Sequence, residues 1–169
     1  ALTSAAETAE RTRLRRVEAL EELREALNLE SLPLRIECYD ISNIQGQEIV
    51  GSMVVFQDAV AKKAHYRKFA VRGLDGQDDF AAMAEVIARR FARLGVTGAE
   101  YDEGFATAPN LVVIDGGKGQ LSAALAAMQA YELPRVAVIA LANVAVTVCS
   151  PSSVAVHELP VQSPSGSIV

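Results

Sequence analysis

The sequence predicts an α/β fold in which a mixed sheet is flanked by helices. Three extended segments at 34–40, 48–56 and 66–71 are rich in β-branched and aromatic residues and are joined by short spacers, which favours an antiparallel meander. The apolar run at 110–114 has no alternation, which is typical of a strand buried on both faces. A helical segment separates it from a second apolar run at 136–141, so these two strands should be parallel.

The chain begins with a helix that we interpret as a linker over 1–30, ahead of one domain over 31–169. Its apolar residues recur at spacings of three or four: Leu14, Val17, Leu20, Leu23 and Leu27. Ser4 and Glu7 have the spacing of a capping box. The arginines between 11 and 16 are interpreted as a solvated face balanced by the glutamates that follow.

A second helix is predicted after Asp78 and Asp79, one of which should be its N-cap. Its expected buried stripe consists of Phe80, Met83, Ala84, Ile87, Phe91 and Leu94. Its expected solvent side carries Glu85, Arg89, Arg90 and Arg93. This periodicity predicts an amphipathic helix lying against the sheet.

The remaining segments complete the order of elements. A loop is expected at 95–109, a small-residue helix at 120–131 and, because 143–156 alternates without any charge, a hairpin at the sheet edge. The tail at 160–169 is expected to be loop. A three-strand meander followed by helix, strand, helix and strand is the order of a ribonuclease-H-like fold, in which the first and fourth strands are neighbours.

Composition limits the classes of function. Half of the 169 residues are apolar, enough for one domain with a core. Cys38 and Cys149 lie far apart without CxxC spacing, so neither a disulfide framework nor a zinc site is indicated, and a cytoplasmic protein is expected. No segment is apolar enough to span a membrane. The formal net charge of −5 argues against nucleic-acid binding by bulk electrostatics alone.

Two aspartates stand where apolar strands are expected to end. Asp40 follows the first strand and Asp115 follows the fourth, so neighbouring strands would bring the carboxylates together as a site for Mg²⁺ or Mn²⁺. Each has a purely structural alternative. Asp40 could form an Asx-turn with Ser42, and Asp115 could cap the following helix. The glycine-rich turn at 116–119 could instead bind phosphate.

Other polar residues are weaker candidates. Asp79 could contact the metal or its water. A basic cluster interleaved with Tyr66 and Phe69 could follow a nucleic-acid backbone or simply be exposed strand charge: Lys62, Lys63, His65, Arg67, Lys68 and Arg72. Lys118, in the turn after Asp115, is a further candidate contact. His157 has no spaced partner and is interpreted as an ordinary histidine.

With these residues in view, the chain resembles the UvrC family, specifically the C-terminal endonuclease domain of the C subunit of the bacterial UvrABC excinuclease. The matching motifs span about 34–141: Glu-Cys-Tyr-Asp-Ile-Ser-Asn-Ile-Gln-Gly at 37–46, Ser-Met-Val-Val-Phe at 52–56, Tyr-Arg-Lys-Phe at 66–69, Asp-Asp-Phe-Ala-Ala-Met at 78–83, Arg-Arg-Phe at 89–91 and Ile-Asp-Gly-Gly-Lys-Gly-Gln-Leu at 114–121.

The resemblance implies a ribonuclease-H-like domain that cuts damaged double-stranded DNA on the 5′ side of a lesion in nucleotide excision repair, using two aspartates, a histidine and a divalent metal. It puts the aspartates at Asp40 and Asp115 and makes Asp79 a further acidic position. It also implies UvrB, and the complex that UvrA loads, as partners.

Two departures from the family stand out. The family's histidine lies in an Arg-Asp-Glu-Ala-His-Arg-Phe stretch downstream of the last residue here, which His157 does not match, so the domain is expected to be truncated and weakly active or inactive. The uncharged stretch at 143–156 replaces a charged hairpin, through divergence or a local reading-frame error. The alternatives are a non-catalytic interaction domain and a phosphate- or nucleotide-binding module.

Overall fold

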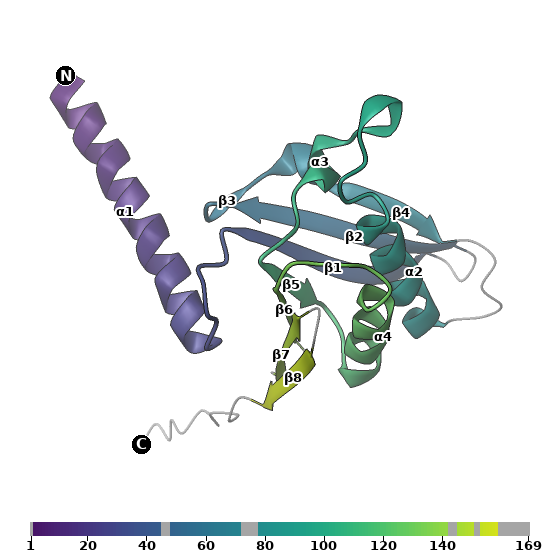
Figure 1. Cartoon of the computed structure of the whole chain (residues 1–169). Coiled ribbons are helices and arrows are strands. Elements are labelled where there is room, and N and C mark those ends of the chain that lie inside the picture. The colour runs from purple at the N-terminus through teal and green to yellow at the C-terminus, as the bar shows by residue number, and fades with distance from the viewer. Residues whose placement is uncertain (1, 45–47, 72–77, 142–144, 151–152, 159–169) are drawn as a thin grey trace, which may run out of the picture.

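The chain folds around one mixed sheet, which a computed structural model describes over residues 2–44, 48–71, 78–141, 145–150 and 153–158 (Figure 1). The strands are β1 (Arg35–Ile44), β2 (Glu48–Gln57), β3 (Val60–Ala61), β4 (Arg67–Val71), β5 (Leu111–Ile114), β6 (Val136–Ala140), β7 (Ala145–Ser150) and β8 (Ser153–Glu158). Within the described residues, no helix is long and apolar enough to cross a membrane.

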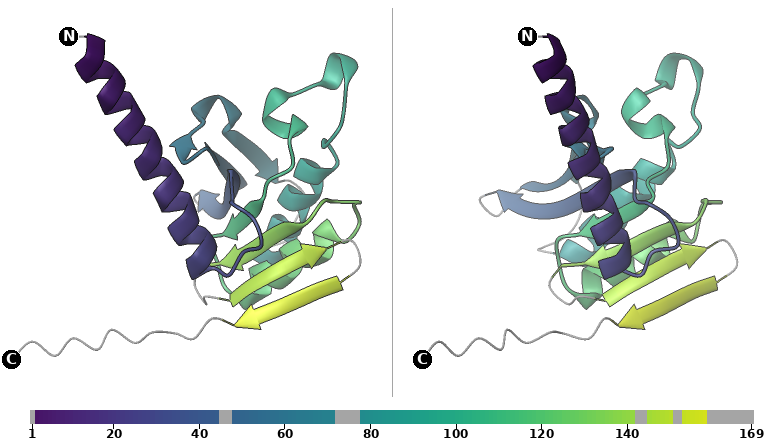
Figure 2. Two further views of the ribbon diagram at one scale, coloured as in Figure 1. Left: turned by 60° about the vertical axis from the view of Figure 1, so that its left-hand side comes forward. Right: turned by 90° about the vertical axis from the view of Figure 1, so that its left-hand side faces the viewer.

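The strand order confirms the predicted α/β fold. The sheet runs β3-β2-β1-β5-β6-β7-β8, and β4 also pairs with β2. The pairs β1–β2 and β2–β4 are antiparallel, as predicted for the meander, whereas β1–β5 and β5–β6 are parallel. The uncharged segment forms the predicted hairpin, β7–β8, with β7 antiparallel to β6 (Figure 2). The tail at 160–169 lies outside the described residues.

Two helices cover one face of the sheet. These are α2 (Asp79–Phe91) and α4 (Lys118–Met128), which pack on each other and on the strands to enclose the main core (Figure 1). The main core takes alternate residues of the strands that it contacts, among them Tyr39, Val112 and Val138. The residues between them on β5 and β6 are buried in a second cluster on the other face of the sheet. This double burial is why β5 and β6 are continuous apolar runs.

The N-terminal helix α1 (Leu2–Ala26) reaches the opposite face only at its C-terminal end (Figure 2). Leu27 and Leu29 pack there against β5 and β6, while residues 4–19 are exposed. The helix is confirmed, but the predicted capping box is wrong. Because the helix already begins at Leu2, Ser4 lies inside it, and its carbonyl accepts a 2.8 Å bond from Thr8 Oγ1.

The second helix begins as predicted but buries a different face. Asp78 is its N-cap and accepts bonds from the amides of Phe80 and Ala81. Phe80, predicted to be core, is 57% exposed, with its ring against the backbone of Gly119. Arg90, predicted to face solvent, is fully buried. The helical pattern assigns every charged side chain to the solvent side. It is wrong at Arg90 because that guanidinium pairs with the buried carboxylate of Glu37 on β1.

Three predicted boundaries also differ. The expected loop at 95–109 contains a 3₁₀ turn, Gly98–Glu100, and the short helix α3 (Glu103–Ala106), which the buried Phe105 anchors. The last predicted helix begins at Lys118 and ends at Met128. Finally, β1 does not end at Asp40: β2 pairs with it along its whole length to Ile44, although β5 pairs with it only as far as Tyr39.

Candidate metal centre

The parallel pair β1–β5 brings Asp40 and Asp115 side by side. Its register aligns Cys38 with Val113 and Tyr39 with Ile114, so the two aspartates are the next residues in line. The Asp115 amide donates a 2.8 Å hydrogen bond to the Tyr39 carbonyl, which continues the ladder to this point. Neighbouring strands lie about 4.8 Å apart, close enough for one ion to bind carboxylates from both.

The two aspartates also share one face of the sheet. Tyr39 and Ile114 belong to the core under α2 and α4, so their successors lie on the other face, with Cys38. Burial, then the negative charges of Glu37 and Asp115, raises the pKa of the Cys38 thiol to about 11. Asp40 is half-buried and Asp115 is exposed.

The two structural alternatives, an Asx-turn at Asp40 and a helix cap at Asp115, are not what the structure shows. The N-cap of α4 is Gly117, whose amide donates to Gln120 Oε1 at 3.2 Å, so Asp115 does not cap that helix. The Gln120 side chain folds over Gly116 and leaves no room for a Cβ there. Asp40 lies within a strand rather than an Asx-turn, and its Oδ2 accepts a 2.6 Å bond from Ser42 Oγ.

The pair offers hard oxygen donors, which are the ligands that Mg²⁺ and Mn²⁺ prefer. Within the described ranges, no three His, Cys, Asp or Glu residues gather into a metal site, so Asp79 is not brought together with the pair. Asp79 Oδ1 instead accepts a 3.2 Å bond from Asn43 Nδ2. By strand alternation Asn43 faces the α2 side, opposite to Asp40. Asp40 and Asp115 are therefore the residues that could hold a metal.

The basic cluster proves to be of mixed kinds. Lys62, Lys63 and Lys68 are exposed, as is Lys118 at the first position of α4. Arg67 is engaged within the protein: it pairs with Asp102 and donates to the carbonyls of Ala64 and Tyr66. His65 is buried rather than exposed. Arg72 lies outside the described residues.

A buried charged network, which sequence reasoning missed, occupies the other end of β1. Glu37 is completely buried and accepts four hydrogen bonds of 2.6–2.9 Å, from Arg35 Nε, Tyr39 Oη and two nitrogens of Arg90. We call Arg35, Glu37, Tyr39 and Arg90 the Glu37 network. Burial is the main cause that raises the pKa of the Tyr39 hydroxyl well above its ordinary value.

The Glu37 network also fixes the segment around α3. Arg35 Nη2 donates to the Gly104 carbonyl at 2.7 Å, and Arg90 donates to the carbonyls of Phe105 and Thr107. Arg35 Nη1 lies 3.0 Å from His65 Nδ1, which must be the acceptor because a guanidinium only donates. A glutamate inside an apolar alternating strand was the available signal, since such a charge requires a buried cation.

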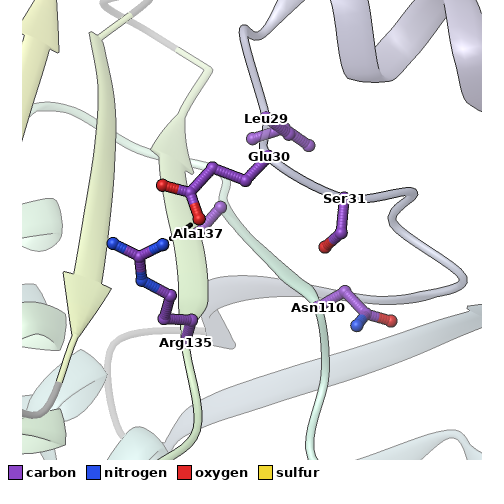
Figure 3. A pocket seen from close by; sticks show the side chains of 6 residues that line it. All are labelled: Leu29, Glu30, Ser31, Asn110, Arg135 and Ala137. Carbon is purple, nitrogen blue, oxygen red and sulfur yellow. Dashed lines mark hydrogen bonds and ion pairs between the residues drawn. The ribbon is translucent and has the colours of Figure 1, made fainter.

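A pocket of about 230 Å³ opens at the opposite end of the parallel strands (Figure 3). It is lined by Leu29, Glu30, Ser31, Asn110, Arg135 and Ala137. Three of its polar residues have partners within the protein: Glu30 pairs with Arg135, and Asn110 Oδ1 accepts from the Arg35 amide at 2.9 Å. Ligands of open α/β sheets bind at the carboxyl-terminal edge of the parallel strands. Asp115 follows β5 at that edge, with Asp40 beside it, so this pocket is not the candidate site.

Comparison with known proteins gives one consistent family. A model of the UvrC RNase H endonuclease domain matches residues 24–163. The chain is 45% identical over 147 residues to the UvrABC system protein C of Streptomyces avermitilis, with 76% of the chain and 22% of that protein covered. It is 47% identical over 160 residues to that of Beutenbergia cavernae (76% and 23% covered) and 51% identical over 126 residues to that of Dehalococcoides mccartyi strain BAV1 (75% and 20% covered). The chain thus spans less than a quarter of these relatives.

Proposed function

The chain belongs to the UvrC RNase H endonuclease domain family, and on that premise we propose that it is a metal-dependent DNA endonuclease domain acting in nucleotide excision repair. The observation that carries the proposal is the register that makes Asp40 and Asp115 neighbours just past the last parallel pair of β1 and β5, on one face of the sheet. Two neighbouring carboxylates that solvent can reach are better suited to bind a metal for phosphoryl transfer than to stabilise the fold.

The proposed roles follow from position. Asp40 and Asp115 hold Mg²⁺ or Mn²⁺, and Ser42, whose hydroxyl bonds to Asp40 Oδ2, orients that carboxylate. A bound divalent ion neutralises the charge that develops on the scissile phosphate. Asp79 acts as a positioning residue, because its bond to Asn43 ties the start of α2 to the end of β1 beyond Asp40.

The substrate we propose is damaged double-stranded DNA, cut on the 5′ side of the lesion, with UvrB and the UvrA-loaded complex presenting the site. The exposed cations Lys62, Lys63, Lys68 and Lys118 are the candidate backbone contacts. The relatives bear the name of the UvrABC system, which supports these partners. The net charge of −5 predicts that this chain alone binds and cuts DNA weakly, since counterion release needs a basic surface.

A chimera tests the proposal. This chain should replace the matching segment of the Streptomyces avermitilis UvrABC system protein C and be assayed, with the A and B proteins of that system, for Mn²⁺-dependent nicking of a lesion-bearing duplex. We expect a 5′ incision that Asp115→Asn reduces by at least about 100-fold, as loss of a main electrostatic stabiliser does. If the folded chimera with Asp115→Asn nicks the duplex as fast as the chimera without it, the proposal is overturned. A folded chimera that neither nicks the duplex nor binds Mn²⁺ would favour a non-catalytic interaction domain.

A further inference from the structure

A cleft of about 360 Å³ opens on the α2 side of the sheet, between β4, the end of α2 and α3, and we call it the arginine cleft. Lys68 borders it at the sheet edge, but that side chain belongs to the other face because it alternates with the core residue Phe69. Three of the lining residues on the α2 side are arginines, although the whole chain has a formal net charge of −5. These lining residues are Arg67, Phe69, Arg89, Ala92, Arg93 and Phe105.

Two buried aromatic rings form the floor of the arginine cleft and hold its guanidinium groups. Arg67 and Arg93 lie over the Phe105 ring, with their Cζ atoms 5.4 and 5.3 Å from its centroid. Arg89 lies over the Phe69 ring, with its Cζ atom 5.5 Å from the centroid. Stacking on a ring restricts a guanidinium while its N–H groups still point outward. The charges are therefore organised before any ligand arrives.

The charges of the arginine cleft are only partly paired within the protein. Asp102 engages Arg67. Glu85 lies 3.2 Å from Arg89 Nη1. Arg93 is exposed, and within the part of the chain that the structure describes it has neither a hydrogen bond nor an ion pair. One organised guanidinium is thus left for an external anion.

The arginine cleft and the carboxylate pair lie on opposite faces of the sheet. Phe69 belongs to the main core, as do Tyr39 and Ile114, so Asp40 and Asp115 face away from the cleft. A nucleic-acid strand bound at the carboxylate pair would therefore not reach Arg93. Binding of a polyanion such as DNA also needs an extended basic surface, which is not expected of an acidic chain. A small cleft with one unpaired guanidinium fits a single carboxylate better.

We propose that the arginine cleft is a docking site for an acidic segment of a partner protein, in which the Arg93 guanidinium binds an Asp or Glu carboxylate of that segment. A guanidinium donates two parallel N–H groups in the geometry that a carboxylate accepts. Arg89 adds positive charge on the same side of the sheet. The site goes beyond the endonuclease and is independent of any metal, because none of its residues belongs to the carboxylate pair.

The test is the binding of a fluorescein-labelled hexaglutamate peptide, followed by anisotropy at physiological salt. Arg93→Gln should weaken binding by about 10-fold, as loss of a hydrogen bond to a charged group does. Arg93→Lys keeps the charge but loses the two parallel donors, so its affinity should be intermediate. Arg16→Gln, on exposed α1, removes the same charge elsewhere and should bind hexaglutamate like the parent chain.

Asp102→Asn is a second and independent variant. It removes the carboxylate that engages Arg67, so more positive charge becomes available in the arginine cleft. An asparagine can still accept the 2.8 Å bond that Asp102 Oδ1 receives from the Gly104 amide, which keeps the start of α3 in place. Hexaglutamate should therefore bind Asp102→Asn more tightly than the parent chain, whereas damage to the fold would weaken binding.

Three results would overturn the inference. Arg93→Gln could bind hexaglutamate as tightly as Arg16→Gln does, which would exclude Arg93 as the contact. Asp102→Asn could bind more weakly than the parent chain, which would exclude an anion site in this cleft. Finally, a short DNA duplex could lose as much affinity in Arg93→Gln as hexaglutamate does, which would assign the arginine cleft to nucleic acid instead of an acidic protein segment.

Discussion

Glu37 and Asp40 lie three residues apart on β1 and carry the same functional group, yet their surroundings are opposite. Glu37 faces the core, is fully buried and has both oxygens occupied by donors from Arg35, Tyr39 and Arg90. Asp40 faces the other side, half-exposed, next in register to a second carboxylate. Strand alternation alone makes this separation, because an odd spacing puts the two side chains on opposite faces.

The comparison shows how one strand can combine a structural and a functional carboxylate. A buried charge is tolerated only when nearby donors satisfy it, and the Glu37 network provides them. Two neighbouring carboxylates at the surface repel each other until a cation binds between them. The first arrangement should be needed for folding, and the second should cost stability in the absence of metal.

The largest expected effect is that of Glu37→Gln. Removing the carboxylate leaves two buried guanidinium groups without their anion, which should lower the free energy of unfolding by about 3–5 kcal/mol. Urea denaturation measures this change. Glu85→Gln is the matched control, since that partly exposed glutamate pairs with Arg89 on one helix face, a pair that contributes about 0.3–0.5 kcal/mol. A similar loss of unfolding free energy in both variants would show that burial does not make the Glu37 ion pairs more important than the Glu85 pair.

Tyr39→Phe should have an intermediate effect. It removes the 2.6 Å bond to Glu37 Oε2 and should cost about 1–2 kcal/mol. Because burial raises the Tyr39 pKa in the folded state, the parent chain keeps this tyrosine's contribution below about pH 10 and loses it as the pH rises further. Unfolding of parent and Tyr39→Phe chains at neutral and alkaline pH should show the difference between them shrink. A constant difference would contradict the linkage.

Asp40→Asn should change stability in the opposite direction to Glu37→Gln. Without metal it removes the repulsion between neighbouring carboxylates, which is about 1 kcal/mol for unit charges 4 Å apart in water. Urea denaturation in the presence of a chelator should therefore show a variant as stable as the parent or up to that much more stable. A loss of more than about 1 kcal/mol would mean that Asp40 is structural, like Glu37.

Asp102→Asn should have the smallest effect, since its carboxylate is only partly buried. The hydrogen bond from Arg67 lowers the Asp102 pKa, so the pair stabilises the fold at neutral pH and loses that contribution as the pH falls below about 4. The cost at pH 7 should be below about 1 kcal/mol and should vanish in acid. Denaturation at neutral and acid pH measures it, and an equal cost at both would exclude the ion pair as the cause.

The sequence predicted the fold because its signals are local. Short spacers predict hairpins, and the continuous apolar runs at 111–114 and 136–140 predict parallel strands that are buried on both faces. From this order of elements, β1 and β5 were predicted to be neighbours in the sheet. The convergence of Asp40 and Asp115 depends only on that topology. Where β1 ends was not predictable, because its last residues are held by pairing with β2 rather than by their own composition.

What the sequence did not predict depends on partners distant along the chain. Arg90 is buried because Glu37, 53 residues away, accepts its hydrogen bonds, and an amphipathic pattern has no means to represent such a pair. Phe80 is 57% exposed, and its ring contacts Gly119 of α4 rather than the core that the helical pattern predicted. The arginine cleft, between β4, the end of α2 and α3, likewise joins residues that no sequence spacing relates, such as Arg67, Arg93 and Phe105.

Binding of Mn²⁺ to the metal-free chain tests the central claim most directly. Calorimetric titration at neutral pH should show binding by the parent chain and by Asp79→Asn, and none by Asp40→Asn or Asp115→Asn. At a free concentration of 100 times Kd, the ion should also stabilise the parent chain by about 2.7 kcal/mol and raise its melting temperature. If Asp40→Asn or Asp115→Asn binds Mn²⁺ as the parent does, with the same rise in melting temperature, the two aspartates do not form the metal site and the account is wrong.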